Sequence, residues 1–437
     1  MMPPRWQRLW LAGIFCCASA AGAADAPLTL SEALKAADAN HPDITQAVAE
    51  RDVAVADEQA AAARSDLAVN LEAGLRRVRP SLMNGGPEDI NDHSLRLNAR
   101  KTLYDFGRTR SAEDAARQVV EARNTELLDA RERHRLDIMA RFFNVLIADM
   151  QASADNEYMS VAFVDFDHGK DRLAVGTLSQ VDLDELEHRY QEALVKRNLS
   201  QVRQRITRSL LANAMNQPGN LRSDLVDPVL DGNQRKLPDY DNVLPSMLEN
   251  NRTLRALRQQ LAAAQKKLEE VRDERGPTLD AELEGADYAT RKLSGRDDLR
   301  MGLVLNWPLY QGGRVEAKLA REQALFHKLQ AAYEKQRLDL SQTLLETLLR
   351  AEQLQSTVRN AAKVQSAYRD EALERARGQY EVELKTNLGT AMAETMDAKL
   401  RERRTEYQLA LSLAQLDALL GTPLESIDAG SQKGKSK

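Results

Sequence analysis

Four segments of the chain alternate apolar and polar residues with a period of two. In the first segment, apolar residues from Leu67 to Leu75 occupy the odd positions, and Glu72 and Arg76 are among the even ones. This alternation predicts a strand with one apolar face and one polar face. The predicted strands are 67–79, 93–103, 278–290 and 298–309.

Most of the remaining chain has the pattern of unusually long helices. No glycine or proline occurs between Thr109 and Gly169, or from Arg314 to Arg377, and apolar residues recur there at helical spacing. A helix of about 60 residues is roughly 90 Å long. We expect each long helix to break at a tip, 169–177 or 378–387, and to return as a second helix. Helices of this length need partners along their sides, so the pattern favours packed hairpins.

The chain also repeats itself. Tyr104–Arg108 reads YDFGR and Tyr310–Arg314 reads YQGGR, and each motif lies between a predicted strand and a long helix. This self-similarity predicts a tandem duplication, with a first repeat at 24–216 and a second at 246–421. Segment 217–245, where proline and glycine cluster, joins the repeats, and 422–437 forms a tail, either packed near the join or disordered.

The glycines of these motifs are expected to have a structural role. A chain that turns from a strand directly into a helix needs a positive φ or a close backbone approach, which glycine allows. Neither motif has the Gly-x-Gly spacing or the Lys-Ser/Thr pair of a nucleotide-binding loop. The predicted turn residues are Gly107, Arg108, Gly312, Gly313 and Arg314.

The N-terminus has the three parts of a secretory signal peptide. Arg5 and Arg8 precede an apolar stretch, which ends at an Ala-Gly-Ala cleavage site. Removal of 1–23 also removes Cys16 and Cys17, the two cysteines of the chain. We therefore expect an exported protein whose mature form has neither disulfides nor a reactive thiol.

Composition and charge exclude several classes of protein. The net charge of −5 gives no basic field for nucleic acid. The mean hydropathy is −0.52, and beyond the leader no apolar run is long enough for a spanning helix. The six histidines show no paired metal-ligand spacing, and no serine or cysteine lies in a nucleophile elbow. The sequence thus predicts no enzyme, no catalytic residue, no metal and no cofactor.

The alternating strands favour a membrane β-barrel over a soluble sandwich. Strands of about ten residues can span a bilayer, with the apolar face toward lipid and the polar face toward a lumen. Four strands cannot close a barrel alone, and open edges in lipid leave backbone groups unsatisfied, so closure requires several chains. The expected lumen residues, of mixed charge, are Glu72, Arg76, Arg96, Asp280, Glu282, Glu284 and Arg300.

Taken together, the leader, the duplication, the long hairpins and the two turn motifs resemble the outer-membrane efflux protein family, the TolC-like channels. The resemblance implies a mainly α fold with a membrane β-barrel. Three chains of four strands would form a twelve-stranded barrel, continued by a long periplasmic α-helical barrel. Segment 217–245 and the tail would then belong to an equatorial region around the helix midpoints. The implied partners are two further copies, outer-membrane lipid, a periplasmic adaptor (membrane-fusion) protein and an inner-membrane transporter of the RND or ABC type.

The same resemblance assigns roles to residues at the helix tips. A closed-state gate would join Asp182 to Tyr380 and Lys385, unless these are simply solvated tip residues. The second tip lacks the glycine of the first, which puts adaptor docking there in doubt. The residues expected to contact an adaptor are Val175, Gly176, Thr177 and Val382.

Three functions remain open at the level of the sequence. The first is the exit duct of a tripartite export system that passively conducts small molecules to the exterior. The second is the exit duct of a type I protein secretion system. The third is a periplasmic structural coiled-coil protein without a channel.

Overall fold

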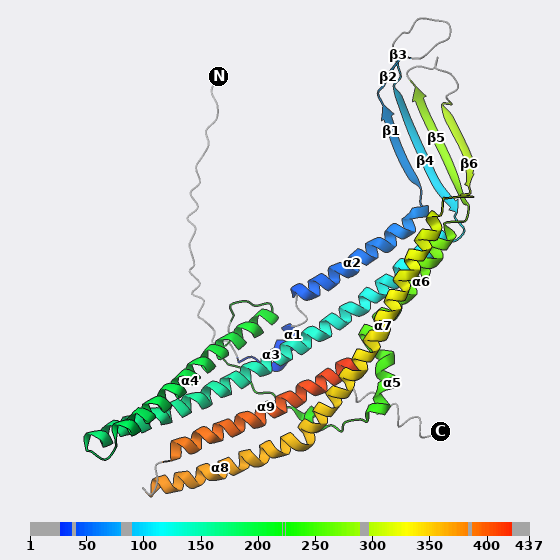
Figure 1. Ribbon diagram of the computed structural model, residues 1–437. Helices are drawn as coiled ribbons and strands as arrows, with labels where there is room; N and C mark the ends of the chain where they lie inside the picture. The colour runs from blue at the N-terminus through cyan, green and yellow to red at the C-terminus, as the bar shows by residue number, and fades with distance from the viewer. Residues whose placement is uncertain are drawn as a thin grey trace, which may run out of the picture.

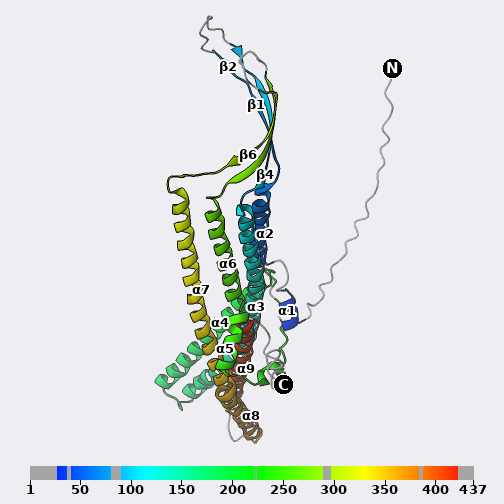
Figure 2. The same ribbon diagram turned by 90° about the vertical axis from the view of Figure 1, so that its right-hand side faces the viewer.

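The chain forms an elongated molecule with a sheet at one end and helical hairpins at the other (Figure 1). This computed structural model describes residues 27–36, 41–79, 90–220, 222, 224–288, 297–382 and 387–421. The predicted leader 1–23, the tail 422–437 and Lys385 of the expected gate lie outside the described residues. Figure 2 shows the sheet from its edge, as a thin curved layer.

Four antiparallel strands form the main sheet, in the spatial order β1-β4-β5-β6. The strands are β1 (Ala68–Gly74), β4 (Ser94–Tyr104), β5 (Thr278–Tyr288) and β6 (Leu299–Asn306). The β4–β5 pairing joins the two sequence halves, and β1 and β6 are left as the edges. The predicted strand 67–79 is shorter than expected, because β1 ends at Gly74 and only Arg77–Val78 (β2) continue, paired with Ile90–Asn91 (β3).

The register places the even-numbered residues of the four strands on one face of this sheet, up to an irregularity in β4 between Thr102 and Tyr104. Glu72 lies opposite Arg96, Arg100 opposite Glu282, and Glu284 opposite Arg300. Because side chains alternate along a strand, the odd-numbered leucines share the other face. The predicted division into a polar and an apolar face is therefore a property of the whole sheet.

In the first half one long helix runs from the sheet toward a tip, and in the second half two helices in succession cover the same course (Figure 1). In the first half, α3 is a single helix of 67 residues, and α2 and α4 lie along it. The helices are α1 (Leu30–Ala36), α2 (Pro42–Ala62), α3 (Arg108–Ala174), α4 (Gln180–Ala214), α5 (Tyr240–Asn250), α6 (Arg252–Asp273), α7 (Arg314–Gln353), α8 (Arg359–Glu381) and α9 (Leu388–Leu420). Short 3₁₀ turns occur at Ala63–Ser65 (η1) and Asp231–Gln234 (η2). Among the described helices, none is both long enough and apolar enough to cross a membrane.

The first tip was expected at 169–177, and the long helix extends through the first part of this range. α3 passes through Gly169 and ends at Ala174, so the turn occupies the residues between Ala174 and Gln180. A Cβ atom at Gly169 would lie 2.7 Å from Leu186 Cδ1 and 3.1 Å from Leu183 Cδ1. The missing side chain of Gly169 therefore allows α4 to pack closely against α3, and the glycine does not end the helix. In the second half, α8 likewise continues through Gly378 to Glu381.

The second long helix contains an interruption that the sequence did not predict. Leu354–Val358 form a π-helical turn (η4) between α7 and α8, without any glycine or proline. Such turns widen the helix by one residue and often mark functional positions. The course from the sheet toward the second tip is thus divided between α7 and α8, whereas α3 alone covers it in the first half.

The two larger of three apolar clusters in the described part of the chain hold the helices together near their midpoints. The first contains Phe142 of α3 and Tyr407 of α9, with residues of α1 and α4. The second contains Leu344 of α7 and Met247 of α5, with residues of α6 and α9. Segment 217–245, which was expected to join the repeats, pairs with Leu28 through Leu225 and contributes η2 and the start of α5.

Candidate functional site

The polar face of the sheet carries charges that are largely paired. Glu72 accepts a hydrogen bond from Arg96 Nη2 at 2.6 Å. Asp280 is only 1% exposed, and it accepts from Thr102 Oγ1 at 2.7 Å and from Arg100. Its carboxylate is therefore bound by side chains of the neighbouring strand β4, and its pairing with Arg100 leaves little net charge on this part of the face.

The other predicted lumen residues lie on the same face or at its end. Glu282 Oε1 is 3.7 Å from Arg100 Nε, and Arg300 lies opposite Glu284 in the register. Arg300 also pairs with Asp297 at 3.4 Å. Arg76 follows the end of β1, where its carbonyl accepts from Asp92 N at 2.7 Å. Opposite charges thus alternate across the strands, which gives this surface a mixed and nearly balanced charge.

The other face of the sheet is apolar and exposed. Leu71 is 68% exposed, Met301 81% and Leu303 66%. Exposed apolar surface of this extent marks a face that contacts lipid or another protein. The two faces together have the character of a wall between an apolar and an aqueous phase.

The first strand-to-helix turn depends on backbone geometry that few residues adopt. Gly107 has φ +96° and is the N-cap of α3, and it follows Phe106 at φ +57°. Asp105, which the sequence reasoning did not single out, provides the cap: its Oδ2 accepts from Thr109 N at 2.7 Å and its Oδ1 from Gly107 N at 3.3 Å. The Asp-x-Gly spacing was the available signal, since Asp readily bonds to backbone amides a few residues on.

The second turn uses two glycines in place of one. Gly312 has φ +60° and Gly313 has φ +76°, and Gly313 is the N-cap of α7. Arg314 reaches back to bond the side chain of Gln311, which occupies the position of Asp105 in the first turn. The nearby Tyr310 is 90% exposed. Both turns therefore redirect the chain through left-handed residues.

The first tip is a tight, glycine-containing turn. Gly176 has φ +76°, and its amide donates to Leu173 O at 2.9 Å. Thr177 closes the end of α3 by donating to Arg172 O from both its amide and its hydroxyl, at 2.8 and 3.0 Å. Val175 is 74% exposed at the apex. The apex thus presents a rigid backbone with an uncovered apolar side chain.

The expected gate residues are only partly placed. Asp182 forms a capping box with Ser179, accepting from its hydroxyl at 2.7 Å. At the second tip, Tyr380 is 54% and Val382 61% exposed, near the end of α8. Lys385 is outside the described residues. In one chain, the carboxylate of Asp182 therefore stabilises the start of its own helix.

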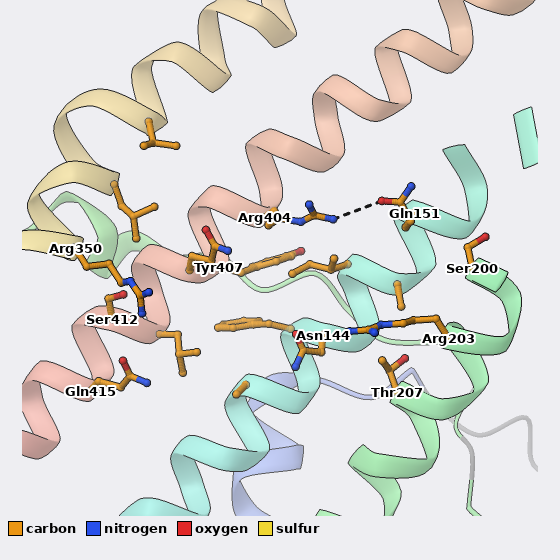
Figure 3. A pocket seen from close by; sticks show the side chains of 18 of the residues that line it. Asn144, Gln151, Ser200, Arg203, Thr207, Arg350, Arg404, Tyr407, Ser412 and Gln415 are labelled. Carbon is orange, nitrogen blue, oxygen red and sulfur yellow. Dashed lines mark hydrogen bonds between the residues drawn. The ribbon is translucent and has the colours of Figure 1, made fainter. Parts of the chain in front are cut away.

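A groove of about 1090 Å³ lies near the helix midpoints, between α3, α4, α9 and the end of α7 (Figure 3). Phe143 and Tyr407 stack at its wall with centroids 4.7 Å apart. Cationic side chains dominate its charged lining, including Arg203, Arg350 and Arg404. Burial raises the pKa of the Tyr407 phenol, whose hydroxyl donates to Asp227 at 2.8 Å.

The π-helical turn is held by the joining segment. Glu406 of α9 accepts from Arg359 Nε at 2.6 Å and from Asn233 Nδ2 at 2.7 Å. Gln355, inside the turn, donates to the carbonyls of Asn233 and Arg235 at 3.0 and 2.9 Å. Sequence reasoning missed this network, because 173 residues separate Asn233 from Glu406.

Known proteins with this architecture identify the family. The family model "Outer membrane efflux protein" matches residues 33–216 and 243–422. The outer membrane channel CmeC of Campylobacter jejuni is similar in fold, with a TM-score of 0.75 and 14% identity over 93% of this chain and 89% of that one. The outer membrane protein VceC of Vibrio cholerae gives 0.70 and 18%, over 90% and 96% of the two chains.

A third relative is the MtrE outer membrane channel of Neisseria gonorrhoeae in its open state. It has a TM-score of 0.70 and 20% identity, over 90% of this chain and 89% of that chain. No curated protein sequence matches significantly. At these identities the structures establish the fold, while the family model covers most of both repeats. The chain therefore belongs to the outer membrane efflux protein family, and it is an outer-membrane channel that extends into the periplasm and not an enzyme.

Proposed function

We propose that three copies of this chain form the exit duct of a tripartite export system, which conducts small molecules from an inner-membrane pump and a periplasmic adaptor to the exterior. The observation that carries the proposal is the open sheet of order β1-β4-β5-β6, in which no other strand among the described residues pairs with the outer edges of β1 and β6. In lipid, unpaired edges cost several kcal/mol per buried group. Pairing β6 of one copy with β1 of the next removes every edge and closes twelve strands.

The helices support the same assembly. α4 carries a stripe of apolar side chains, Val195, Leu199, Val202 and Ile206, all more than half exposed. Their spacing of three and four residues is that of a seam between packed helices. In a ring of three chains, this seam is covered by a neighbouring copy, so the helical part continues the duct below the barrel.

Within this duct, each surface has a proposed role. The even-numbered face of the sheet lines the lumen, and its paired charges favour weak ion selectivity. Val175, Gly176 and Thr177 form the first adaptor contact, and Val382 forms the second. Asp182 leaves its cap to bond Tyr380 and Lys385 across the closed aperture.

Cysteine cross-linking tests the trimer directly, since both native cysteines lie in the predicted leader. Leu71→Cys on β1 is combined in turn with Met301→Cys, Leu303→Cys or Leu305→Cys on β6, and isolated outer membranes are oxidised. We expect dimers and trimers on denaturing gels from at least one pair. Leu71→Cys with Leu97→Cys is the matched control, because these residues pair within one chain and should give only monomers.

The assembly proposal fails if every β1–β6 pair stays monomeric while the control pair is oxidised. Export is tested separately in a Gram-negative host that lacks its own efflux channel. The chain is expressed there together with its cognate adaptor and pump, and extrusion of a fluorescent pump substrate is measured. An assembled trimer that restores no extrusion would refute the export role and leave the assembly intact.

A further inference from the structure

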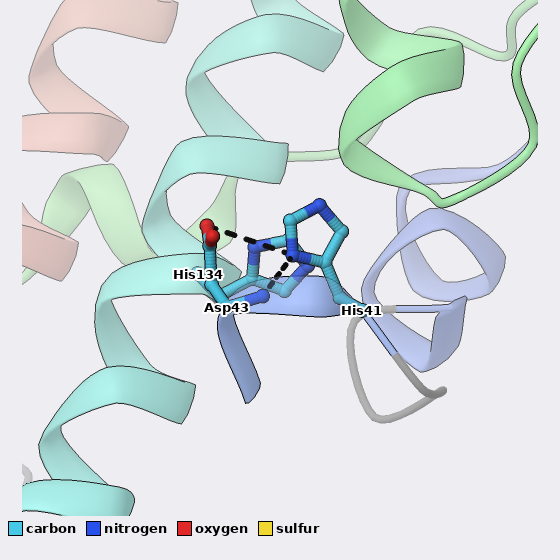
Figure 4. A group of neighbouring side chains, drawn as sticks. All are labelled: His41, Asp43 and His134. Carbon is cyan, nitrogen blue, oxygen red and sulfur yellow. Dashed lines mark hydrogen bonds and ion pairs between the residues drawn. The ribbon is translucent and has the colours of Figure 1, made fainter. Parts of the chain in front are cut away.

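Two histidines from different helices stack near the start of α2 (Figure 4). The ring centroids of His41 and His134 are 4.1 Å apart, with the planes tilted by 30°. His134 lies within α3 and is only 6% exposed, whereas His41 directly precedes α2. The pair thus joins the beginning of the first repeat to the middle of its longest helix.

The buried histidine has an unsatisfied nitrogen. Among the described residues, no hydrogen-bond partner reaches Nε2 of His134. Buried polar atoms are nearly always paired, so an unpartnered one requires an explanation. A neutral imidazole can offer such a nitrogen to a metal ion.

A carboxylate completes the group. Asp43 Oδ2 lies 3.6 Å from His41 Nδ1, and one donor atom from each of His41, Asp43 and His134 lies within 4.8 Å of the other two. A zinc ion at 2.0–2.2 Å from each ligand would bring donors to within about 4 Å of one another. The side chain of Asp43 is 78% exposed, so its rotation can supply the small closure needed.

We propose that His41, Asp43 and His134 form a binding site for a divalent transition-metal ion of the zinc class. Two imidazoles and one carboxylate suit Zn²⁺, Co²⁺, Ni²⁺ or Cu²⁺, whereas Ca²⁺ and Mg²⁺ require mainly oxygen ligands. The exposed side of Asp43 leaves a fourth position open to water. A bound ion would fasten the start of α2 to α3.

Zinc titration of the purified, untagged full-length protein in detergent tests the site. We expect one high-affinity Zn²⁺ per chain by calorimetry at pH 7.4, and a rise in Tm with Zn²⁺ but not with Ca²⁺. His41→Asn and Asp43→Asn should each weaken Zn²⁺ binding at least about tenfold. The side chain of Asp43 is exposed, whereas that of His41 is only 16% exposed. His41 is the N-cap of α2, and its Nδ1 accepts a long hydrogen bond of 3.3 Å from Asp43 N, which a bound ion would replace. Asparagine at position 41 can provide the same cap.

His188→Asn, at an exposed histidine of α4, is the matched control and should bind Zn²⁺ like the wild type. Co²⁺ substitution adds a spectroscopic readout, with visible bands characteristic of nitrogen coordination that disappear in His134→Gln. Equal Zn²⁺ affinity in the wild type, His41→Asn and Asp43→Asn would overturn the proposal. Absence of stoichiometric Zn²⁺ binding by the wild type would overturn it as well.

Discussion

Asp182 belongs to the proposed gate and also caps α4, and these two roles predict different effects when the residue is changed. Its carboxylate accepts from Ser179 Oγ at 2.7 Å and from Ser179 N at 3.4 Å. Loss of such a cap costs about 0.5–2 kcal/mol of stability. A charge-assisted bond across a closed aperture would contribute about 1.5–3 kcal/mol per chain, or about 4.5–9 kcal/mol in a trimer. At 1.4 kcal/mol per factor of ten, losing three such bonds would lower the closed-to-open ratio by about three to six powers of ten.

Two substitutions separate these contributions. Asp182→Asn removes the charge but keeps an oxygen that can accept from Ser179, and Asp182→Ala removes both. If the gate exists, both variants raise the open fraction and single-channel conductance in planar bilayers, while only Asp182→Ala lowers Tm. Ser179→Ala removes the cap without touching the carboxylate, so it should lower Tm and leave conductance nearly unchanged.

Glu185→Gln is the matched control for charge removal on the same helix. Glu185 is exposed and bonds Arg189 one turn further along α4, so neutralising it should change neither Tm nor conductance measurably. Trimers are checked on unheated gels before each recording. Wild-type conductance in intact trimers of both Asp182→Asn and Asp182→Ala would refute the gate and leave Asp182 as a capping residue.

Three further predictions concern stability, each measured by thermal or denaturant unfolding. Gly169→Ala places a methyl group against Leu186 and should cost about 1–3 kcal/mol, whereas Gly378→Ala meets open space within α8 and should be neutral or stabilising by up to about 1 kcal/mol. Glu406→Leu leaves the half-buried Arg359 without its carboxylate and should cost about 3–5 kcal/mol. A loss under 1 kcal/mol would contradict a stabilising role of the Glu406–Arg359 ion pair. His134 has a lowered pKa in the folded state, so the unfolded chain binds more protons below about pH 6.5. Stability should therefore fall as the pH drops from about 6.5, and His134→Gln should reduce this slope.

The sheet and its turns could be predicted from the sequence because their signals are local. A period of two fixes which side chains share a face, and a glycine between a strand and a helix indicates a turn. The pairing of β4 with β5 could not be predicted from such local signals, since it brings together residues as distant in sequence as Arg100 and Asp280, which are 180 residues apart. Only the fold brings these two charges together. The sequence predicted Asp280 as a lumen residue but did not single out Arg100, so it could not show that the two charges neutralise each other.

The errors have a common physical cause. A glycine inside a helical pattern either ends the helix or allows another helix to approach, and the two cases look alike in sequence. Gly169 belongs to the second case, because Leu183 and Leu186 occupy the space of its missing side chain. The contact between His41 and His134 could not be predicted from the sequence for a similar reason, since the two residues meet only through the packing of α1 and α2 against α3.

The two predicted repeats differ in one stretch of their long helices, and this difference bears on how the tips can move. At the offset that aligns Arg108 with Arg314, η4 corresponds to residues 148–152, which are uninterrupted helix in α3. The first hairpin is thus continuous with its rod from the sheet to the tip. The second is divided by a π-helical turn, which is fixed by Gln355 and Glu406 to the joining segment. A change in backbone bonding at one turn requires less reorganisation than bending a continuous helix, so we expect movement of the tips relative to the sheet to be easier in the α8–α9 hairpin.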